Sequence, residues 1–336
     1  MKAYELREAF GIDHLAITGQ VTPSPGRGQA LVKIRAVSLN YRDLLVVKGL
    51  YNPHIHLPFT PFSDGAGDVV AIGEGVSRVK VGDRVAGIFM QDWLGGELTE
   101  AKQKSALGGG KQGMLAEYVV LGEDGLVHIP EHLTYEEAAT LPCAAVTAWH
   151  AVIEAGLRPG DRVLLLGTGG VSLFSLQFAR ITGAEVIITS GSDEKLEKAA
   201  HLGAAHGINY RTLPEWDRRA RELTGGAGVD LVVEVGGAGT LPQSIRAVRT
   251  GGRISLIGVL TGAKGEINPR PIVMKNIRLQ GILVGSREMF ESMNKAIILH
   301  RLQPVVDRVF SFGEVRDALR YMESGSHFGK IGVSLP

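Results

Sequence analysis

A glycine-rich segment carries the clearest chemistry in this sequence. The apolar run 162–166 leads into Gly167-Thr-Gly169-Gly170-Val171-Ser172, and a helical window follows to about residue 182. A diphosphate reaches the backbone amides at a helix N-terminus only where no side chain intervenes, and glycine leaves that space. The third position of this pattern is usually Gly or Ala, and Ser172 is small enough to replace them. The segment therefore predicts a dinucleotide site, with Gly167, Gly169, Gly170 and Val171 against the cofactor.

The end of the next apolar run indicates which dinucleotide binds. Enzymes built for NAD usually place Asp or Glu there, about 20 residues past the first glycine, to bind the ribose hydroxyls. Ser190 occupies this position, and Gly191, Ser192 and Lys195 follow it. Small hydroxyls, a helix N-terminus and a cation suit a 2′-phosphate, so the sequence predicts NADPH over NADH. The alternative is that Ser192 is only a helix cap and Lys195 only a solvated side chain.

The elements that must position these residues alternate from Asp161 onward. Apolar runs separated by helical windows predict a doubly wound α/β fold, a Rossmann domain with a six-stranded parallel sheet. Gly183 and Gly203 stand where helices need left-handed caps. The expected strands are 162–166, 185–189, 206–208, 230–235, 253–257 and 278–283.

The chain before about residue 125 is different, because short β-rich runs such as 30–37 and 67–72 alternate with turn clusters. It predicts a barrel-type β domain. Thr134 and Glu137 then form a capping box that begins a new helix. A helix from 286 to about 300, a strand at 305–310 and a last strand at 330–335 are too few for a third domain. We therefore expect residues 1–144 and 285–336 in the first domain and 145–284 in the Rossmann domain.

Composition excludes several classes of partner. The 36 basic and 35 acidic residues leave a net charge of +1 and are spread along the chain, which argues against nucleic acid. No run approaches the roughly 20 apolar residues that span a bilayer, and the first residues show no signal pattern. The single cysteine, Cys143, cannot form an internal disulfide. We expect a cytoplasmic protein that acts on a small molecule.

Several motifs, taken together with the β domain and the Gly167 turn, give the chain a family resemblance. It resembles the medium-chain dehydrogenase/reductase superfamily over essentially its whole length, and within it the zinc-free quinone oxidoreductases and related alcohol dehydrogenase-like proteins. The resemblance implies a GroES-like catalytic domain beside the Rossmann domain. The supporting segments are Leu141–Thr147, Asn40–Asp43, Lys48–Tyr51, Gly65–Gly67, Val81–Val85 and Gly329–Lys330.

The resemblance also implies that no catalytic zinc is bound. Zinc alcohol dehydrogenases of the superfamily hold the metal with a Cys, a His and a second Cys, and the matching positions here are Asn40, Ser63 and Cys143. Asparagine and serine are poor zinc ligands. The four-cysteine structural zinc lobe is replaced by 91–113, a segment without cysteine. His54 and His56, with Asp64 and Cys143, are the alternative metal ligands.

The same comparison implies the contacts of the cofactor. Gly191, Lys195 and Tyr210 match the residues that hold the 2′-phosphate in the zinc-free enzymes, and Lys330 matches a basic residue near the diphosphate. Thr147 lines the nicotinamide, and it counts among the catalytic candidates as well. The other expected contacts are Val235, Ile257, Gly258, Val259, Ile282 and Val284.

Without a metal, the substrate itself must be electrophilic. Zinc stabilises developing charge on oxygen by several kcal/mol, whereas quinones and α,β-unsaturated carbonyl compounds need only hydrogen bonds to their oxygen. The expected donors are Asn40, Tyr41 and above all Tyr51, with Asp43 orienting its neighbours. Leu45 stands where zinc enzymes often have a relay histidine, so we expect the proton to come from solvent.

Two other functions remain open at this point. One is an alcohol or aldehyde dehydrogenase with unusual metal ligands, and the other is a sensor or structural protein that binds NADPH without turnover. Self-association as a homodimer or homotetramer, through the strand near 278–284, is implied by the resemblance. The segment 91–113 is expected to cover the substrate pocket, but its residues carry no interpretable chemistry.

Overall fold

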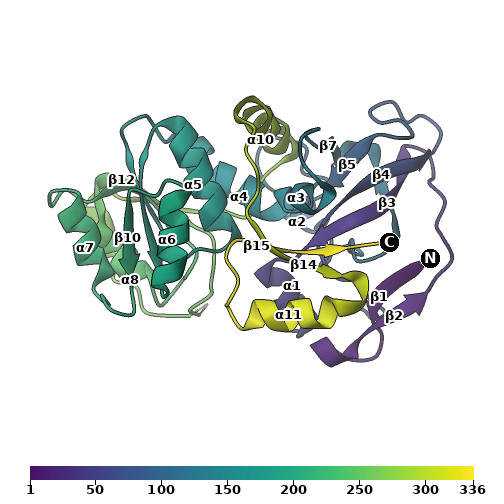
Figure 1. The fold of residues 1–336 in the computed structure, drawn as a ribbon, viewed down its shortest axis with the longest axis horizontal. Coiled ribbons are helices and arrows are strands. Elements are labelled where there is room, and N and C mark those ends of the chain that lie inside the picture. Colours follow the sequence, from purple (N-terminus) through teal and green to yellow (C-terminus); the bar gives the residue numbers. More distant parts are fainter. Residues whose placement is uncertain (263) are drawn as a thin grey trace. The chain divides into compact units, whose positions relative to one another are not determined.

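The structure, a computed structural model, describes residues 1–262 and 264–336. The chain divides into two compact units. Unit 1 comprises Met1–Val146 and Gly285–Pro336, and unit 2 comprises Thr147–Val284. Both are α/β, as Figure 1 shows.

Unit 2 contains a six-stranded, fully parallel sheet in the order β10-β9-β8-β11-β12-β13. This is the strand order of the doubly wound dinucleotide-binding fold, and it confirms the predicted class. The strands are β8 Arg162–Leu165, β9 Glu185–Ser190, β10 His206–Asn209, β11 Val229–Glu234, β12 Val248–Leu256 and β13 Arg278–Gly281. The helices are α5 Gly170–Thr182, α6 Asp193–His201, α7 Trp216–Leu223, α8 Leu241–Ala247 and α9 Arg270–Met274.

The central strands of this sheet are apolar because helices cover both faces, so their sequences do not alternate. Leu164, Ile187 and Val232 are fully buried in its core. Gly183, with a φ of 83°, ends α5 in the left-handed conformation expected of it. One strand of this sheet differs from expectation by more than two residues, since β12 begins at Val248 instead of Arg253. Val248 pairs with Val229 before a register shift, and residues 249–252, which are not apolar, separate Val248 from the apolar run that predicted the strand.

Unit 1 is built on a seven-stranded mixed sheet in the order β14-β15-β3-β4-β5-β7, with β6 paired to β3. A separate antiparallel pair is formed by β1 and β2. The strands are β1 Lys2–Leu6, β2 Leu15–Gly19, β3 Gln29–Ser38, β4 Asp64–Ile72, β5 Arg84–Gly87, β6 Tyr118–Gly122, β7 Leu126–His128, β14 Val306–Ser311 and β15 Lys330–Ser334. The helices of four or more residues are α1 Tyr41–Val47, α2 Glu100–Gln103, α3 Tyr135–Ala138, α10 Arg287–His300 and α11 Val315–Glu323, and α4 Val146–Trp149 crosses the boundary between the units.

The C-terminal segment returns to the sheet of the first 146 residues. The terminal strand β15 pairs antiparallel with β3, where Val333 lies opposite Val37, and parallel with β14. Ile34, Val37 and Val333 are fully buried together in the core of this unit. As a result, Lys330 at the start of β15 is brought beside the residues that follow β3.

The predicted capping box forms, and it begins a helix of only one turn. Thr134 accepts a hydrogen bond from the Glu137 amide at 3.2 Å, and the Glu137 side chain accepts one from the Thr134 amide at 2.9 Å. The chain continues as wide π-helical turns over Leu141–Ala145 and His150–Glu154 on either side of α4. The new helix expected after Thr134 is thus interrupted.

Candidate active site

The predicted cofactor residues of unit 2 lie at one edge of its sheet. Gly167 follows β8, Ser190 ends β9 and Tyr210 directly follows β10. Val235 directly follows β11 in the same way, while Ile257 and Ile282 directly follow β12 and β13. The strands are all parallel, so their carboxyl ends share the edge where doubly wound folds bind their ligands.

The glycine turn after β8 leaves a backbone surface open. Gly167 has a φ of 75°, which only glycine adopts readily, and its amide donates to Thr189 Oγ1 at 3.1 Å. Gly169 is the N-cap of α5, and its φ of −83° suits any residue. A Cβ added to Gly169 would have no atom of the protein within 4 Å. The protein itself does not require glycine there, which is the situation expected where a ligand must approach the amides.

The polar residues after β9 form the start of α6. Ser192 is the N-cap of this helix and accepts a hydrogen bond from the Lys195 amide at 3.4 Å. The Ser192 amide in turn donates to Ser190 Oγ at 3.3 Å. Ser192 therefore caps the helix, which is the role that the alternative interpretation gave it. The cap also fixes two hydroxyls beside a helix N-terminus, where the dipole favours an anion.

The structure adds Arg211 to this group, a residue that sequence reasoning missed. A Cβ on Gly191 would lie 2.8 Å from Tyr210 Oη and 2.9 Å from Arg211 Nε, so both side chains pass close to the backbone of Gly191. Tyr210 is half-exposed and its amide donates to the Ser190 carbonyl at 3.0 Å. The sequence did contain a signal for Arg211, because it follows Tyr210 directly after β10, where cofactor-binding residues are expected.

A buried carboxylate organises the next loop along the edge. Glu234, at the end of β11, accepts hydrogen bonds at Oε1 from the amides of Gly236 (2.8 Å) and Gly237 (3.0 Å) and from Thr240 Oγ1 (2.6 Å). Ser244 donates to its other oxygen. Sequence reasoning also missed this anchor, which looks like any acidic residue at a strand end.

The loops after β11 and β12, which both contain predicted cofactor residues, are brought together. A Cβ on Gly258 would lie 2.0 Å from the Val235 carbonyl oxygen, so glycine is required there by the close approach of the two loops. The neighbouring Ile257 is half-buried, whereas Val259 is exposed.

Three further predicted residues of unit 2 are buried. Thr147, Ile282 and Val284 are each less than a tenth exposed, and the Ile282 amide donates to the Leu256 carbonyl at 2.8 Å. Val284 has a φ of 56°, which is strained for a β-branched residue. Its carbonyl accepts a hydrogen bond from His150 Nδ1 at 2.8 Å, so the conformation is held from within the unit.

Unit 1 contains a buried polar network at the position that the resemblance assigns to a metal. Lys330 donates at 2.5 Å to the Leu39 carbonyl and at 2.6 Å to Asn40 Oδ1. Asn40 Nδ2 donates to Ser63 Oγ at 3.3 Å, and Ser63 Oγ donates to Asp64 Oδ1 at 2.7 Å. Burial raises the pKa of Asp64, although the nearby Lys330 ammonium opposes that effect.

These residues do not fit a tetrahedral zinc ion. The Asn40 oxygen is occupied by an ammonium group, and the Ser63 hydroxyl is donated to a carboxylate. Burial, and then the Asp64 carboxylate, raise the pKa of the Cys143 thiol above its usual range, whereas zinc binds the thiolate. His54 and His56 are exposed, and the described residues contain no group of three or more His, Cys, Asp or Glu side chains able to hold a metal.

Asp43 and Arg42 form a second buried pair beside Asn40. Asp43 Oδ2 accepts a hydrogen bond from the Asn40 amide at 2.8 Å, which completes a capping box at the start of α1. Its Oδ1 lies 3.9 Å from Arg42 Nη1. Burial raises the pKa of Asp43 to about 7, against the attraction of the Arg42 guanidinium.

Arg42 connects the predicted tyrosine to the segment 91–113. Its guanidinium lies 5.0 Å from the ring centre of Tyr51 and 4.5 Å from that of Phe89, and its Nη1 donates to the Leu107 carbonyl at 2.8 Å. Tyr41 and Tyr51 are both half-exposed, at 42% and 46%. Of the expected oxygen donors, these two tyrosines are accessible, whereas both polar atoms of the Asn40 side chain are used within the protein.

Known proteins match the chain in both units. Residues 26–131 match the family model described as alcohol dehydrogenase GroES-like domain, and residues 170–298 match the one described as zinc-binding dehydrogenase. A zinc-type alcohol dehydrogenase-like protein of Schizosaccharomyces pombe is 46% identical, with 98% of this chain and 97% of that protein covered. The chain belongs to the medium-chain dehydrogenase/reductase superfamily. This confirms the resemblance, and with it the GroES-like and Rossmann fold.

Two solved structures show the range of this superfamily. An NAD-dependent alcohol dehydrogenase superposes with a TM-score of 0.92 at 33% identity, with 100% of both chains covered. A crotonyl-CoA carboxylase/reductase in complex with NADP superposes with a TM-score of 0.87 at 25% identity, with 99% of this chain and 94% of that chain covered. The first is named as NAD-dependent and the second is bound to NADP, so both of these neighbours use a nicotinamide dinucleotide. As a member of the same superfamily, this chain is an oxidoreductase. None of its described helices is long and apolar enough to cross a membrane.

Proposed function

We propose that this oxidoreductase uses NADPH to reduce quinones or α,β-unsaturated carbonyl compounds, without zinc. The observation that carries the proposal is the polar cluster after β9 and β10. Ser190 replaces the carboxylate that would bind the ribose of NAD, and Gly191 lies against Tyr210 and Arg211. A 2′-phosphate carries negative charge, so a cation and hydroxyls favour it where a carboxylate would repel it.

The network of Asn40, Ser63 and Lys330 supports the zinc-independent part of the proposal. An ammonium group already lies at 2.6 Å from the Asn40 oxygen, and a divalent cation beside it would be repelled. This arrangement is compatible with a substrate that is reduced without a Lewis acid. The reductase of crotonyl-CoA named above acts on an α,β-unsaturated thioester, which is the second substrate class proposed here.

When bound, the reduced nicotinamide supplies hydride to an electrophilic carbon. The protein's own residues bind the cofactor and orient the substrate. The amides after Gly169 hold the diphosphate, and the hydroxyl of Tyr51 or Tyr41 donates to the substrate oxygen as negative charge develops there. Arg42, which lies against the Tyr51 ring, fixes that ring. The proton that completes the reduction comes from solvent.

The test is oxidation of NADPH and of NADH by the purified protein with quinones, enones and aldehydes, together with elemental analysis for zinc. We expect turnover of quinones or enones with NADPH by a protein free of stoichiometric zinc. Turnover restricted to alcohols or aldehydes with bound zinc would favour the metal-dependent alternative. NADPH binding without any turnover would favour a sensor or structural protein.

We also propose that the enzyme self-associates through β13. This strand ends the sheet of unit 2, and all four of its residues are exposed. An exposed strand edge offers unpaired backbone groups to a second copy. Light scattering coupled to gel filtration should show a dimer or tetramer. Leu279→Asp, which places like charges of the two copies at the exposed strand, should reduce it to monomer.

A further inference from the structure

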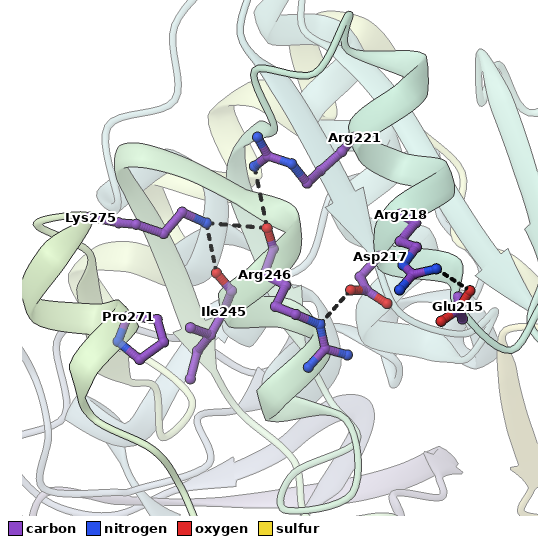
Figure 2. Close-up of a pocket in the computed structure, with 8 residues that line it drawn as sticks. All are labelled: Glu215, Asp217, Arg218, Arg221, Ile245, Arg246, Pro271 and Lys275. Atoms are coloured by element: carbon purple, nitrogen blue, oxygen red, sulfur yellow. Dashed lines mark hydrogen bonds and ion pairs between the residues drawn. The ribbon is translucent and has the colours of Figure 1, made fainter.

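Unit 2 contains a pocket that the dinucleotide chemistry does not explain. It has a volume of about 440 Å³ and lies between α7, α8 and α9. Figure 2 shows its lining, which is Glu215, Asp217, Arg218, Arg221, Ile245, Arg246, Pro271 and Lys275. Arg221, Arg246 and Lys275 shortly precede β11, β12 and β13, so they lie toward the amino ends of the strands. The cofactor residues lie at the carboxyl ends, which are the opposite edge.

Two of the four cations in this pocket are neutralised by carboxylates. Arg218 Nη1 lies 2.8 Å from Glu215 Oε2, and Arg246 Nε lies 2.6 Å from Asp217 Oδ2. Asp217 is buried, which fixes its Arg246 partner in place. The charge that remains therefore belongs to Arg221 and Lys275.

These two cations converge on the same end of α8, as the dashed lines in Figure 2 show. Lys275 Nζ directs its three protons at backbone carbonyls, those of Ile245 at 2.9 Å, Arg246 at 3.1 Å and Val248 at 2.5 Å. Arg221 Nη1 donates to the Arg246 carbonyl at 3.4 Å and the Ala227 carbonyl at 3.5 Å, and its Nη2 donates to the Gly226 carbonyl. Among the described residues, no carboxylate lies within 4.0 Å of either cation. Carbonyl groups satisfy the hydrogen bonds of these cations but carry no net charge, so the two positive charges are not neutralised.

The electrostatics of Lys275 agree with this geometry. Burial, and then the charge of Arg221, lower the pKa of the Lys275 ammonium. A bound anion would relieve that repulsion. Ile245 and Pro271 supply an apolar wall beside the cations, and the volume is within the range that holds small organic ligands.

We propose that this pocket is a second binding site, for a small molecule that joins a carboxylate or phosphate to an apolar body. The anionic group lies against Arg221 and Lys275, and the apolar body lies against Ile245 and Pro271. This inference is independent of the proposed reaction, because none of these residues belongs to the cofactor edge or to the Asn40 network.

Calorimetric titration of the full chain saturated with NADPH tests the proposal. The probes are benzoate, phenyl phosphate and neutral benzamide at constant ionic strength. We expect saturable binding of at least one anion and none of benzamide. Binding of only one anion then identifies whether the ligand is a carboxylate or a phosphate.

Variants place the binding in this pocket. Arg221→Gln and Lys275→Gln should each weaken the anion at least about tenfold, because each removes one of the two positive charges that attract it. Arg218→Gln is the matched control and should leave the affinity unchanged, because Arg218 is paired with Glu215. Lys275→Arg keeps the charge if Lys275→Gln fails to fold, and it should retain binding. Equal affinity in all variants, equal binding of benzamide, or no saturable binding of either anion in the millimolar range would overturn the proposal.

Discussion

Lys330 Nζ lies 2.6 Å from Asn40 Oδ1, although the two residues are 290 positions apart in the chain. The contact exists because β15 pairs with β3, which places the first residue of one strand beside the residues that follow the other. Both side chains are buried. The ammonium therefore connects the C-terminal segment to the Asn40 network.

Replacing Lys330 by Met should destabilise the enzyme. The substitution leaves the Leu39 carbonyl and Asn40 Oδ1 buried without a donor, and an unsatisfied buried group costs about 1–3 kcal/mol. The measurement is urea unfolding. The control is Lys48→Met, which removes a lysine whose partner Glu323 is solvent-accessible and should change the unfolding free energy by less than about 0.5 kcal/mol. Similar midpoints for the two variants would contradict the role assigned to Lys330.

How much of this arrangement the sequence could predict depends on the range of the interactions. Local signals sufficed for the positions of most strands of unit 2, the Gly167 turn and the caps at Gly183 and Thr134, because each depends on a few adjacent residues. The partner of Lys330 could not be predicted in this way, since the register of β15 on β3 is set by packing of the whole sheet. Arg211 was missed for a related reason, because its closeness to Gly191 depends on the pairing of β9 with β10.

Gly169→Ala should separate cofactor binding from stability. No atom of the protein lies within 4 Å of the added methyl group, so the unfolding free energy should change by less than about 0.5 kcal/mol. The methyl group would meet the diphosphate, and NADPH binding should weaken at least about tenfold, which corresponds to about 1.4 kcal/mol. The matched variant is Gly258→Ala. Its Cβ would lie 2.0 Å from the Val235 carbonyl oxygen, so this substitution should unfold the loop or the whole protein. Unchanged NADPH affinity in Gly169→Ala would refute the placement of the diphosphate.

Arg211→Ala and Lys195→Ala should change the choice between the two cofactors. Each removes a cation expected at the 2′-phosphate, which NADH lacks, so KM for NADPH should rise roughly tenfold or more while KM for NADH stays the same. Lys198→Ala is the control, because Lys198 lies one turn further along α6 and pairs with Glu194 at 2.6 Å. The measurement is steady-state kinetics with both cofactors. If KM for both cofactors rose equally, the residues would hold the common part of the dinucleotide and not the phosphate.

Asp43→Asn should flatten the dependence of stability on pH. Burial raises the pKa of Asp43 from 3.8 to about 7 in the folded protein, so between these values the folded state keeps a proton that the unfolded state has lost. The folded state is thus favoured at low pH, and its stability falls as pH rises toward 7, by up to about 1.4 kcal/mol per pH unit. The side-chain amide introduced by the substitution does not titrate, and its oxygen can still accept the hydrogen bond from the Asn40 amide. Urea unfolding of both proteins at several pH values from 5 to 8 measures the difference, with Asp92→Asn, an exposed carboxylate, as the control. Parallel curves for Asp43→Asn and the parent protein would show that Asp43 is ionised throughout this range and that Arg42 outweighs the cost of its burial.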